Sequence, residues 1–170
     1  MTRRFRPPIY ATSHRGVTQW MLNIGDDEQQ VILRLLGELR SILSDDDDGD
    51  GNVDEGRALL LQRLFPTAYP DDEEKEAEYQ RLMRDDLVTS RVVQIDAVSE
   101  AFAGGSTTLQ ESEVIALMQS VNAVRVVLGT MLDVGEDDEI GTAGEEFEAE
   151  RQLYGFLSWL LDWIVRSLQT

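Results

Sequence analysis

The acidic residues at 44–57, SDDDDGDGNVDEGR, have the spacing that comes nearest to a ligand-binding motif in this sequence. They follow the template of the EF-hand calcium loop, in which carboxylates at fixed positions supply oxygens to the ion. Gly51 falls at position six, where the loop turns sharply, and Val53 falls at position eight. The carboxylates at positions one, three, five and nine are Asp46, Asp48, Asp50 and Asp54. The stretch is therefore a candidate calcium site.

Position twelve of this template argues against calcium. Arg57 stands there, where the loop needs a glutamate that gives two oxygens to the ion. EF-hands also work in pairs, and the other candidate loop, read from Asp137, has Thr142 where the template needs glycine. We therefore expect a solvated linker, held extended by repulsion among its charges, and keep a weak metal site as the alternative.

Catalytic side chains other than carboxylates are scarce. His14 is the only histidine and there is no cysteine, which excludes a disulfide, a thiolate site, a thiol switch and a two-histidine metal site within this chain. No serine lies in a G-x-S-x-G elbow, and AFAGGSTT lacks the lysine of a P-loop. We predict a protein that is not an enzyme and has no cofactor, with an incidental His14. An enzyme that holds magnesium at DDEE or GEDDE is the last alternative.

The charge is strongly one-sided. Thirty-three acidic residues against fifteen basic ones give a formal net charge of -18. This charge repels phosphate backbones and attracts basic proteins, so we expect partner proteins with a basic surface and no direct nucleic-acid binding. A basic cluster near the N-terminus is formed by Arg3, Arg4, Arg6 and Arg15. These arginines either lie against the acidic surface of the protein or lead a DNA-binding alternative.

The hydrophobic pattern predicts a mainly α fold with a single domain over residues 1–170. Residues 1–24 are expected to form a small β-hairpin or an extended arm, because VTQWMLNI alternates and prolines precede it. Residues 26–168 predict a bundle of about five helices, with acidic loops at 44–56 and 135–146. No signal peptide and no apolar run of membrane-spanning length is recognised, so we expect a cytoplasmic protein.

Several helix boundaries are predicted from local signals. Asp26 or Asp27 is placed to cap the first helix, and a capping box from Thr108 to Glu111 precedes a later one. The segment that begins DDEEKEAEYQ predicts one long helix, or two helices joined near Thr89. Each of these signals places a helix end within the bundle.

The last predicted helix is apolar almost all round from Leu153 to Leu168, and Trp159 and Trp163 lie one turn apart on it. Two opposed surfaces are therefore expected to cover it. It is either the central helix of the bundle or the seam of a dimer, and we expect a homodimer.

Arg125 interrupts the apolar sequence VNAVRVVLGTML. At the edge of an apolar stripe it either anchors an anionic ligand or forms an ion pair with an acid on a neighbouring helix. We expect the ion pair, because a half-buried arginine normally finds a carboxylate.

Three segments together resemble an actinobacterial family, the AosR-like oxidative stress regulators, formerly catalogued as a domain of unknown function. They are RLFPTAYPDDEEKEAEYQRLMRDDL (63–87), LMQSVNAVRVVLGTMLDV (117–134) and YGFLSWLLDWIVRSL (154–168). The order and spacing match over most of the chain, and LFPTAY is the most distinctive piece. The motif positions that we single out are Leu64, Phe65, Pro66, Tyr69, Asn122, Arg125, Gly129, Tyr154 and Trp159.

The resemblance implies a cytoplasmic, non-enzymatic regulator that contacts other proteins within a transcription complex. The chain departs from the family where Asn-Asp usually precedes the arginine, since Ala123 follows Asn122, and where Gly-x-Arg-Leu has Met131. Sensing through a cysteine pair does not carry over, because the chain has no cysteine.

Calcium titration tests the interpretation of residues 44–57. We expect no binding heat and no change in melting temperature at millimolar calcium, because Arg57 opposes the ion where a bidentate carboxylate is needed. Saturable heat, with a rise in melting temperature that an Asp48→Asn variant loses, would contradict the linker interpretation.

Overall fold

The computed structural model describes residues 6–44, 55–105, 107–132 and 147–169. The four aspartates of the EF-hand template lie outside these ranges, as does the second acidic loop at 135–146. Arg3 and Arg4 of the N-terminal basic cluster also fall outside them, whereas Arg6 and Arg15 are described and exposed.

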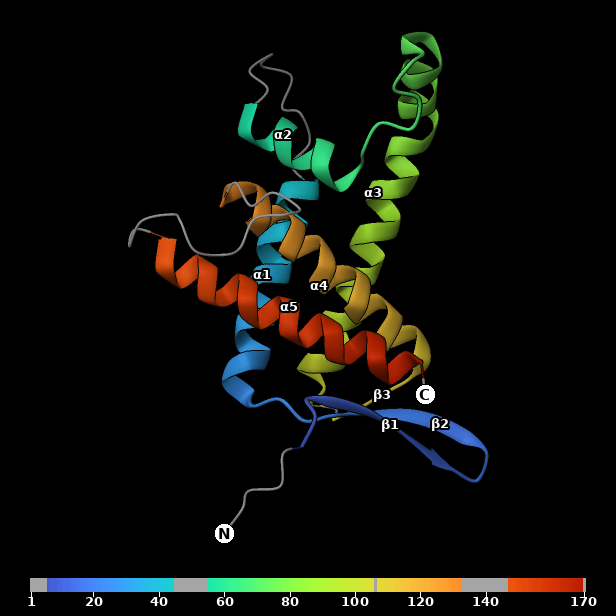
Figure 1. Ribbon diagram of the computed structural model, residues 1–170. Coiled ribbons are helices and arrows are strands. Elements are labelled where there is room, and N and C mark those ends of the chain that lie inside the picture. Colours follow the sequence, from blue (N-terminus) through green and yellow to red (C-terminus); the bar gives the residue numbers. More distant parts are fainter. Residues whose placement is uncertain (1–5, 45–54, 106, 133–146, 170) are drawn as a thin grey trace.

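The mainly α fold with an N-terminal hairpin is confirmed (Figure 1). A three-stranded antiparallel sheet of order β1-β2-β3 accompanies five helices. The strands are β1 (Ile9–His14), β2 (Val17–Leu22) and β3 (Thr108–Leu109). The helices are α1 (Asp26–Ser44), α2 (Glu55–Leu64), α3 (Glu73–Ala103), α4 (Glu111–Met131) and α5 (Glu148–Leu168).

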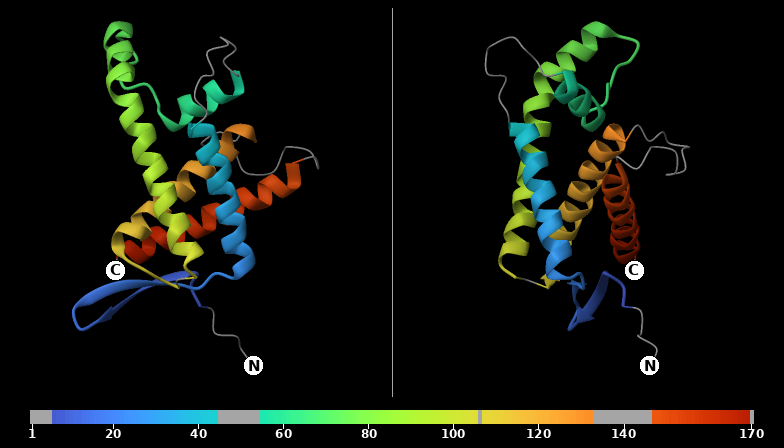
Figure 2. Two further views of the ribbon diagram at one scale, coloured as in Figure 1. Left: turned by 180° about the vertical axis from the view of Figure 1, so that it is seen from behind. Right: turned by 90° about the vertical axis from the view of Figure 1, so that its left-hand side faces the viewer.

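Helix α4 is the centre of the bundle. It contacts α1, α2, α3, α5 and β2, and it lies between α5 on one side and the α1 and α3 pair on the other (Figure 2). Its fully buried side chains include Val114, Leu117 and Val121. Of the two alternatives for the last helix, the central position in the bundle is therefore wrong, and α5 forms an outer layer whose inner face packs on α4 and β1.

Small side chains explain why α4 takes the central place. Ala116, Ser120, Ala123 and Gly129 are all buried on it, so neighbouring helices can approach its backbone closely. By length and composition α4 could also cross a membrane, contrary to the expectation that no segment has this property. More than half of it is buried inside the bundle, as in the core helix of a soluble protein.

The sheet closes one end of the bundle (Figure 1). Ile9, Trp20, Leu22 and Leu109 are buried against the helices, which leaves the other face of the sheet toward solvent. The indole Nε1 of Trp20 donates a buried hydrogen bond to the carbonyl oxygen of Ser167, 3.1 Å away. This carbonyl lies in the last turn of α5, where helices leave backbone acceptors without internal partners. The hairpin therefore completes the C-terminal end of α5.

The hairpin has a two-residue turn, as its pairing of His14 with Val17 requires. Arg15 and Gly16 have φ values of 52° and 80°, which is the conformation of a type I′ turn and suits the right-handed twist of the strands. His14 is exposed beside this turn.

Two predicted helix starts are wrong by two residues or fewer. Asp26 and Asp27 lie in the first turn of α1 instead of capping it, and there they favour the positive end of the helix dipole. The capping box of α4 joins Gln110 to Glu113, whose Oε2 accepts the Gln110 backbone N–H at 2.7 Å. Thr108 is not part of it because this residue pairs in β3.

Helix α3 continues through Thr89 without a break, so one long helix is the correct alternative. Asp72 caps its start by accepting the Lys75 backbone N–H at 3.0 Å. The buried residues of α3 are Ile95, Val98 and Phe102, all in its last third. The first half therefore projects beyond the bundle (Figures 1 and 2).

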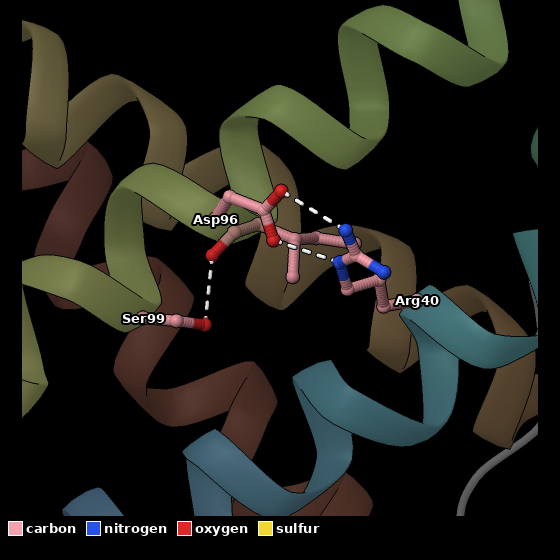
Figure 3. Close-up of polar contacts among 4 residues, drawn as sticks. Arg40, Asp96 and Ser99 are labelled. Atoms are coloured by element: carbon pink, nitrogen blue, oxygen red, sulfur yellow. Dashed lines mark hydrogen bonds and ion pairs between the residues drawn. The ribbon is translucent and has the colours of Figure 1, made fainter. Parts of the chain in front are cut away.

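A two-point contact fixes α3 against α1. Figure 3 shows Arg40 of α1 facing Asp96 of α3, with Nε 2.8 Å from Oδ1 and Nη2 3.3 Å from Oδ2. This fork-to-fork geometry is the most directional form of the arginine–carboxylate contact. It lies at the surface, so its contribution is chiefly to the relative orientation of the two helices.

Truncation of a buried leucine on α4 and of an exposed leucine on α3 tests whether α4 forms the core while the first half of α3 projects beyond it. Leu117→Ala on α4 is expected to lower the free energy of unfolding by about 2–5 kcal/mol, because it leaves a cavity in the core. Leu82→Ala on the projecting half of α3, where the side chain is 59% exposed, is expected to change it by less than about 0.5 kcal/mol. Urea unfolding at equal protein concentration measures both, and similar losses would contradict the central place of α4.

Candidate functional site

A groove lies between the end of α1, helix α2 and the middle of α3. Its volume is about 880 Å³. Apolar side chains form much of its lining, while polar and charged ones also border it. The lining residues are Leu43, Ser44, Arg57, Ala58, Leu61, Gln62, Phe65, Thr67, Gln80, Arg84, Asp85, Val88, Thr89, Val92 and Val93. We call this region the α1–α2–α3 groove.

The groove exists because α2 and the first half of α3 diverge. Leu61, Leu64 and Phe65 of the α2 region are buried toward the bundle, but α3 buries no residue before Ile95. Val88 and Val92 are consequently only partly covered, and Val93 is 61% exposed. These three valines offer apolar surface that no described residue covers fully.

Arg57 connects helices α1 and α2 beside the groove. Its Nε donates a hydrogen bond to the carbonyl oxygen of Ile42 at 3.0 Å. The last turn of α1 has no basic residue of its own, so this contact brings a cation and a donor to the negative end of the helix. Arg57, which stands where the EF-hand template needs a glutamate, thus joins the start of α2 to the end of α1.

The LFPTAY segment forms the connection between α2 and α3. Pro66 directly follows the buried Phe65, and Tyr69 makes an edge-on ring contact with Tyr79 at 5.9 Å between centroids. Oε2 of Glu76 accepts the backbone N–H groups of Ala68 and Tyr69 at 3.0 and 2.8 Å. The carboxylate on α3 therefore holds the connecting segment in place at the edge of the groove.

Gln80 links the same carboxylate to the groove lining, since its Nε2 donates to Oε1 of Glu76 at 2.7 Å. This bond, followed by those from the Tyr69 and Ala68 N–H groups, lowers the pKa of Glu76 below its ordinary value. The ionised form is thus favoured in the folded protein.

A second polar cluster joins α4 to α5. Arg125 donates through Nη2 to Oδ1 of Asn122 at 3.3 Å and through Nη1 to the Tyr154 hydroxyl at 3.5 Å. Its Cζ also lies 5.7 Å from the centre of the Tyr154 ring, within the range of a cation–π contact. Gly129 lies close to this ring, since a Cβ there would be 3.2 Å from Cε2 of Tyr154, which is tighter than an ordinary van der Waals contact.

The expected ion pair of Arg125 is wrong as far as the described residues go. Its contacts there are an aromatic ring, a hydroxyl and an amide oxygen, and Nε is buried without a hydrogen-bond partner among them. The α4–α5 cluster thus brings together Asn122, Arg125, Gly129 and Tyr154, which sequence alone singled out as separate motif positions.

The α1–α2–α3 groove and the α4–α5 cluster are separate regions of the molecule. None of the groove-lining residues belongs to α4 or α5, and Trp159 lies exposed on the outer layer of the bundle. Sequence reasoning missed Glu76, Gln80, Arg84 and Val93 as members of the groove region. The acidic run DDEEKE signalled the start of a helix, but no local pattern indicates that one of its carboxylates reaches back to residues 68 and 69.

The sequence comparisons bear on both regions. The chain matches, over residues 2–168, the family described as Domain of unknown function (DUF2017). It belongs to this family. Comparisons with curated proteins and with solved structures find no match. The DUF2017 match spans the groove and the α4–α5 cluster alike.

Candidate metal ligands lie apart in the described ranges 6–44, 55–105, 107–132 and 147–169. No group of three or more histidine, aspartate or glutamate side chains converges there in a way that could hold an ion. Of the DDEE residues at the start of α3, Asp72 is the helix cap, and Glu73 and Glu74 lie in the first turn.

Glu76 provides a test of how the LFPTAY segment is held. Glu76→Ala is expected to accelerate amide exchange at Ala68 and Tyr69 several-fold at pH 7, because both N–H groups lose their acceptor. The folded pKa of Glu76 is depressed, so its stabilising effect is present above the unfolded value of about 4.5 and is lost as the pH falls through the folded pKa.

Exchange measured between pH 7 and pH 3, after correction for the intrinsic rates, follows this loss. Glu78→Ala, an exposed acid on the same helix, is the control. If both variants accelerate exchange at residues 68 and 69 equally, the carboxylate of Glu76 does not hold this segment.

Proposed function

We infer that this protein is a cytoplasmic regulatory adaptor that acts by binding other proteins and performs no chemistry of its own. The α1–α2–α3 groove is the observation that carries this proposal. Its volume is about 880 Å³, and the apolar side chains of Val88, Val92 and Val93 remain accessible along one side. Helices of partner proteins commonly bind in such grooves through apolar residues repeated at i, i+3, i+4 and i+7.

The charge around the groove defines the kind of partner. Asp85 and Arg84 lie in its lining, and the first turn of α3, which lies outside the lining, carries Glu73, Glu74 and Glu76. Arg57, one of the two arginines in the groove lining, is already hydrogen-bonded to the carbonyl oxygen of Ile42 at the end of α1. With a net charge of -18 on the whole chain, an amphipathic helix with a basic polar face fits best.

The resemblance to the AosR-like oxidative stress regulators supports a role in the transcriptional response to stress. In this proposal the chain contributes binding and not sensing, because it lacks the cysteines of a thiol switch. DNA contact led by Arg6 and Arg15 on the hairpin side is the competing proposal, and a gel shift on promoter DNA at moderate salt separates the two.

Matched substitutions on α3 test the groove. Val93→Glu places a charge on the groove lining, whereas Leu82→Glu makes a similar change at an equally exposed position outside it. The full-length protein captures its partner from native lysate, and the identified partner is then titrated against each variant.

We expect Val93→Glu to weaken binding by roughly tenfold or more and Leu82→Glu to leave it close to wild type, since buried apolar anchors dominate such interfaces. Equal effects of the two variants, or no specific partner at low salt, would contradict the proposal. Circular dichroism confirms that both variants fold.

A further inference from the structure

The outward face of α5 has a feature that the packing within the chain does not explain. Gly155 lies in the middle of this 21-residue helix, and a Cβ added to it would meet no atom within 4 Å. Glycine inside a helix is destabilising relative to alanine. Gly129 on α4 contrasts with it, because there the Tyr154 ring occupies the space that a side chain would need. The described residues thus give no packing reason for a glycine at position 155, just as they give none for Gly37 on α1.

Large aromatic side chains border this glycine. Trp159, one turn further along, is 42% exposed, and its ring lies 6.1 Å from that of Phe156. Tryptophan is the residue most enriched at the energetic centres of protein interfaces. The inner face of α5, with Leu157, Leu160 and Ile164, is already buried in the bundle, so these aromatic rings belong to a different surface.

The residues in line with Gly155 and Trp159 recur at intervals of three and four, so they share one face of the helix. We call this line the α5 seam. Its members are Glu148, Gln152, Gly155, Trp159, Asp162 and Arg166. None of them is buried, and the views in Figure 2 show α5 on the outer side of α4, opposite α1 and α3.

We propose that the α5 seam is the interface with a second copy of this chain, in which the two α5 helices cross antiparallel and Trp159 of each copy fills the space over Gly155 of the other. This inference goes beyond the proposed adaptor function, because it uses a surface that shares no residue with the α1–α2–α3 groove. It assigns the predicted homodimer to specific residues.

Charge complementarity identifies the second copy as the occupant. A register that seats Trp159 over Gly155 places residues at equal distances on either side of position 157 opposite each other. Glu148 of one copy then faces Arg166 of the other. The contact occurs twice about the two-fold axis, as an isologous interface requires.

A parallel pairing of the two α5 helices would bring like charges together. With the two-fold axis along the helices, Asp162 would face Asp162 of the second copy and Arg166 would face Arg166. Like charges opposed in this way are destabilising. The seam is therefore self-complementary only in the antiparallel direction.

The side chains at the two ends of the seam are accessible to a second copy. Arg166 now lies 2.9 Å from Asp162, and Arg151 contacts Glu148 at 2.6 Å, all within α5. The Arg166–Asp162 pair is exposed on both sides and contributes little to stability, so Arg166 can contact the second copy at little loss. The Arg151 side chain is only 14% exposed and keeps its contact with Glu148, whose own side chain is 59% exposed and can accept a further contact.

Sedimentation equilibrium of the full chain, from about 1 to 300 µM because a single helix pair makes a small interface, measures the association. We expect a reversible wild-type dimer. Trp159→Asp is expected to be monomeric over this range, whereas Val165→Asp, a 36% exposed position of the same helix outside the seam, remains dimeric. A monomeric wild type, or equal loss in the two variants, would overturn the proposal.

Gly155→Leu separates the interface from effects on folding. It is expected to raise the melting temperature of the monomer, because leucine favours a helix, and to weaken dimerisation at least tenfold, because it fills the space for Trp159. Unchanged dimerisation would overturn the register.

Charge reversal gives an independent check. Glu148→Arg and Arg166→Glu should each weaken the dimer, and the double variant should regain most of the loss, whereas no recovery would exclude the antiparallel pairing. Partner binding at the groove is measured separately with the Val93 and Leu82 variants, so failure of one proposal leaves the other testable.

Discussion

Enclosure of α4 is the constraint on which the rest of the structure depends. Val114, Leu117, Val121 and Val124 are buried around this helix, so it has to be covered on several sides at once. Helices α1 and α3 cover one side, α5 covers another, and α2 and the sheet complete the enclosure. Because small side chains on α4 let these elements approach closely, the helices around it need apolar residues on one face only. Their outer faces remain free for charge and for contacts with other molecules.

Much of the fold could be predicted because its signals are local. The change from alternating residues to a helical period at Asp26, the glycines that end α3 and the proline after α2 all act within a few residues. Which helix lies at the centre of the bundle does not follow from such local signals. The aromatic residues of α5 suggested a core position, but tryptophan is seldom fully buried, and the better indicator was the set of small residues on α4.

The candidate sites could be predicted less well. The partners of Arg125 lie on α5 as well as α4, and the partners of Glu76 precede it by seven and eight residues in a connecting segment. The groove depends on how far α3 diverges from α2, which follows from packing over the whole bundle and has no local signature. The motif positions singled out in the sequence therefore include residues of both regions, whereas the contacts among these residues depend on the folded structure.

The bond from Trp20 to Ser167 also bears on how the chain folds during synthesis. It joins residues separated by 147 positions, so the strand that is made early cannot reach its final partner until α5 has emerged from the ribosome. Until then Ile9, Trp20 and Leu22 lack part of the surface that buries them. Pairing across so large a separation is slow because the intervening chain must first be ordered. The nascent hairpin is thus a transiently exposed apolar edge, of the kind that general chaperones recognise.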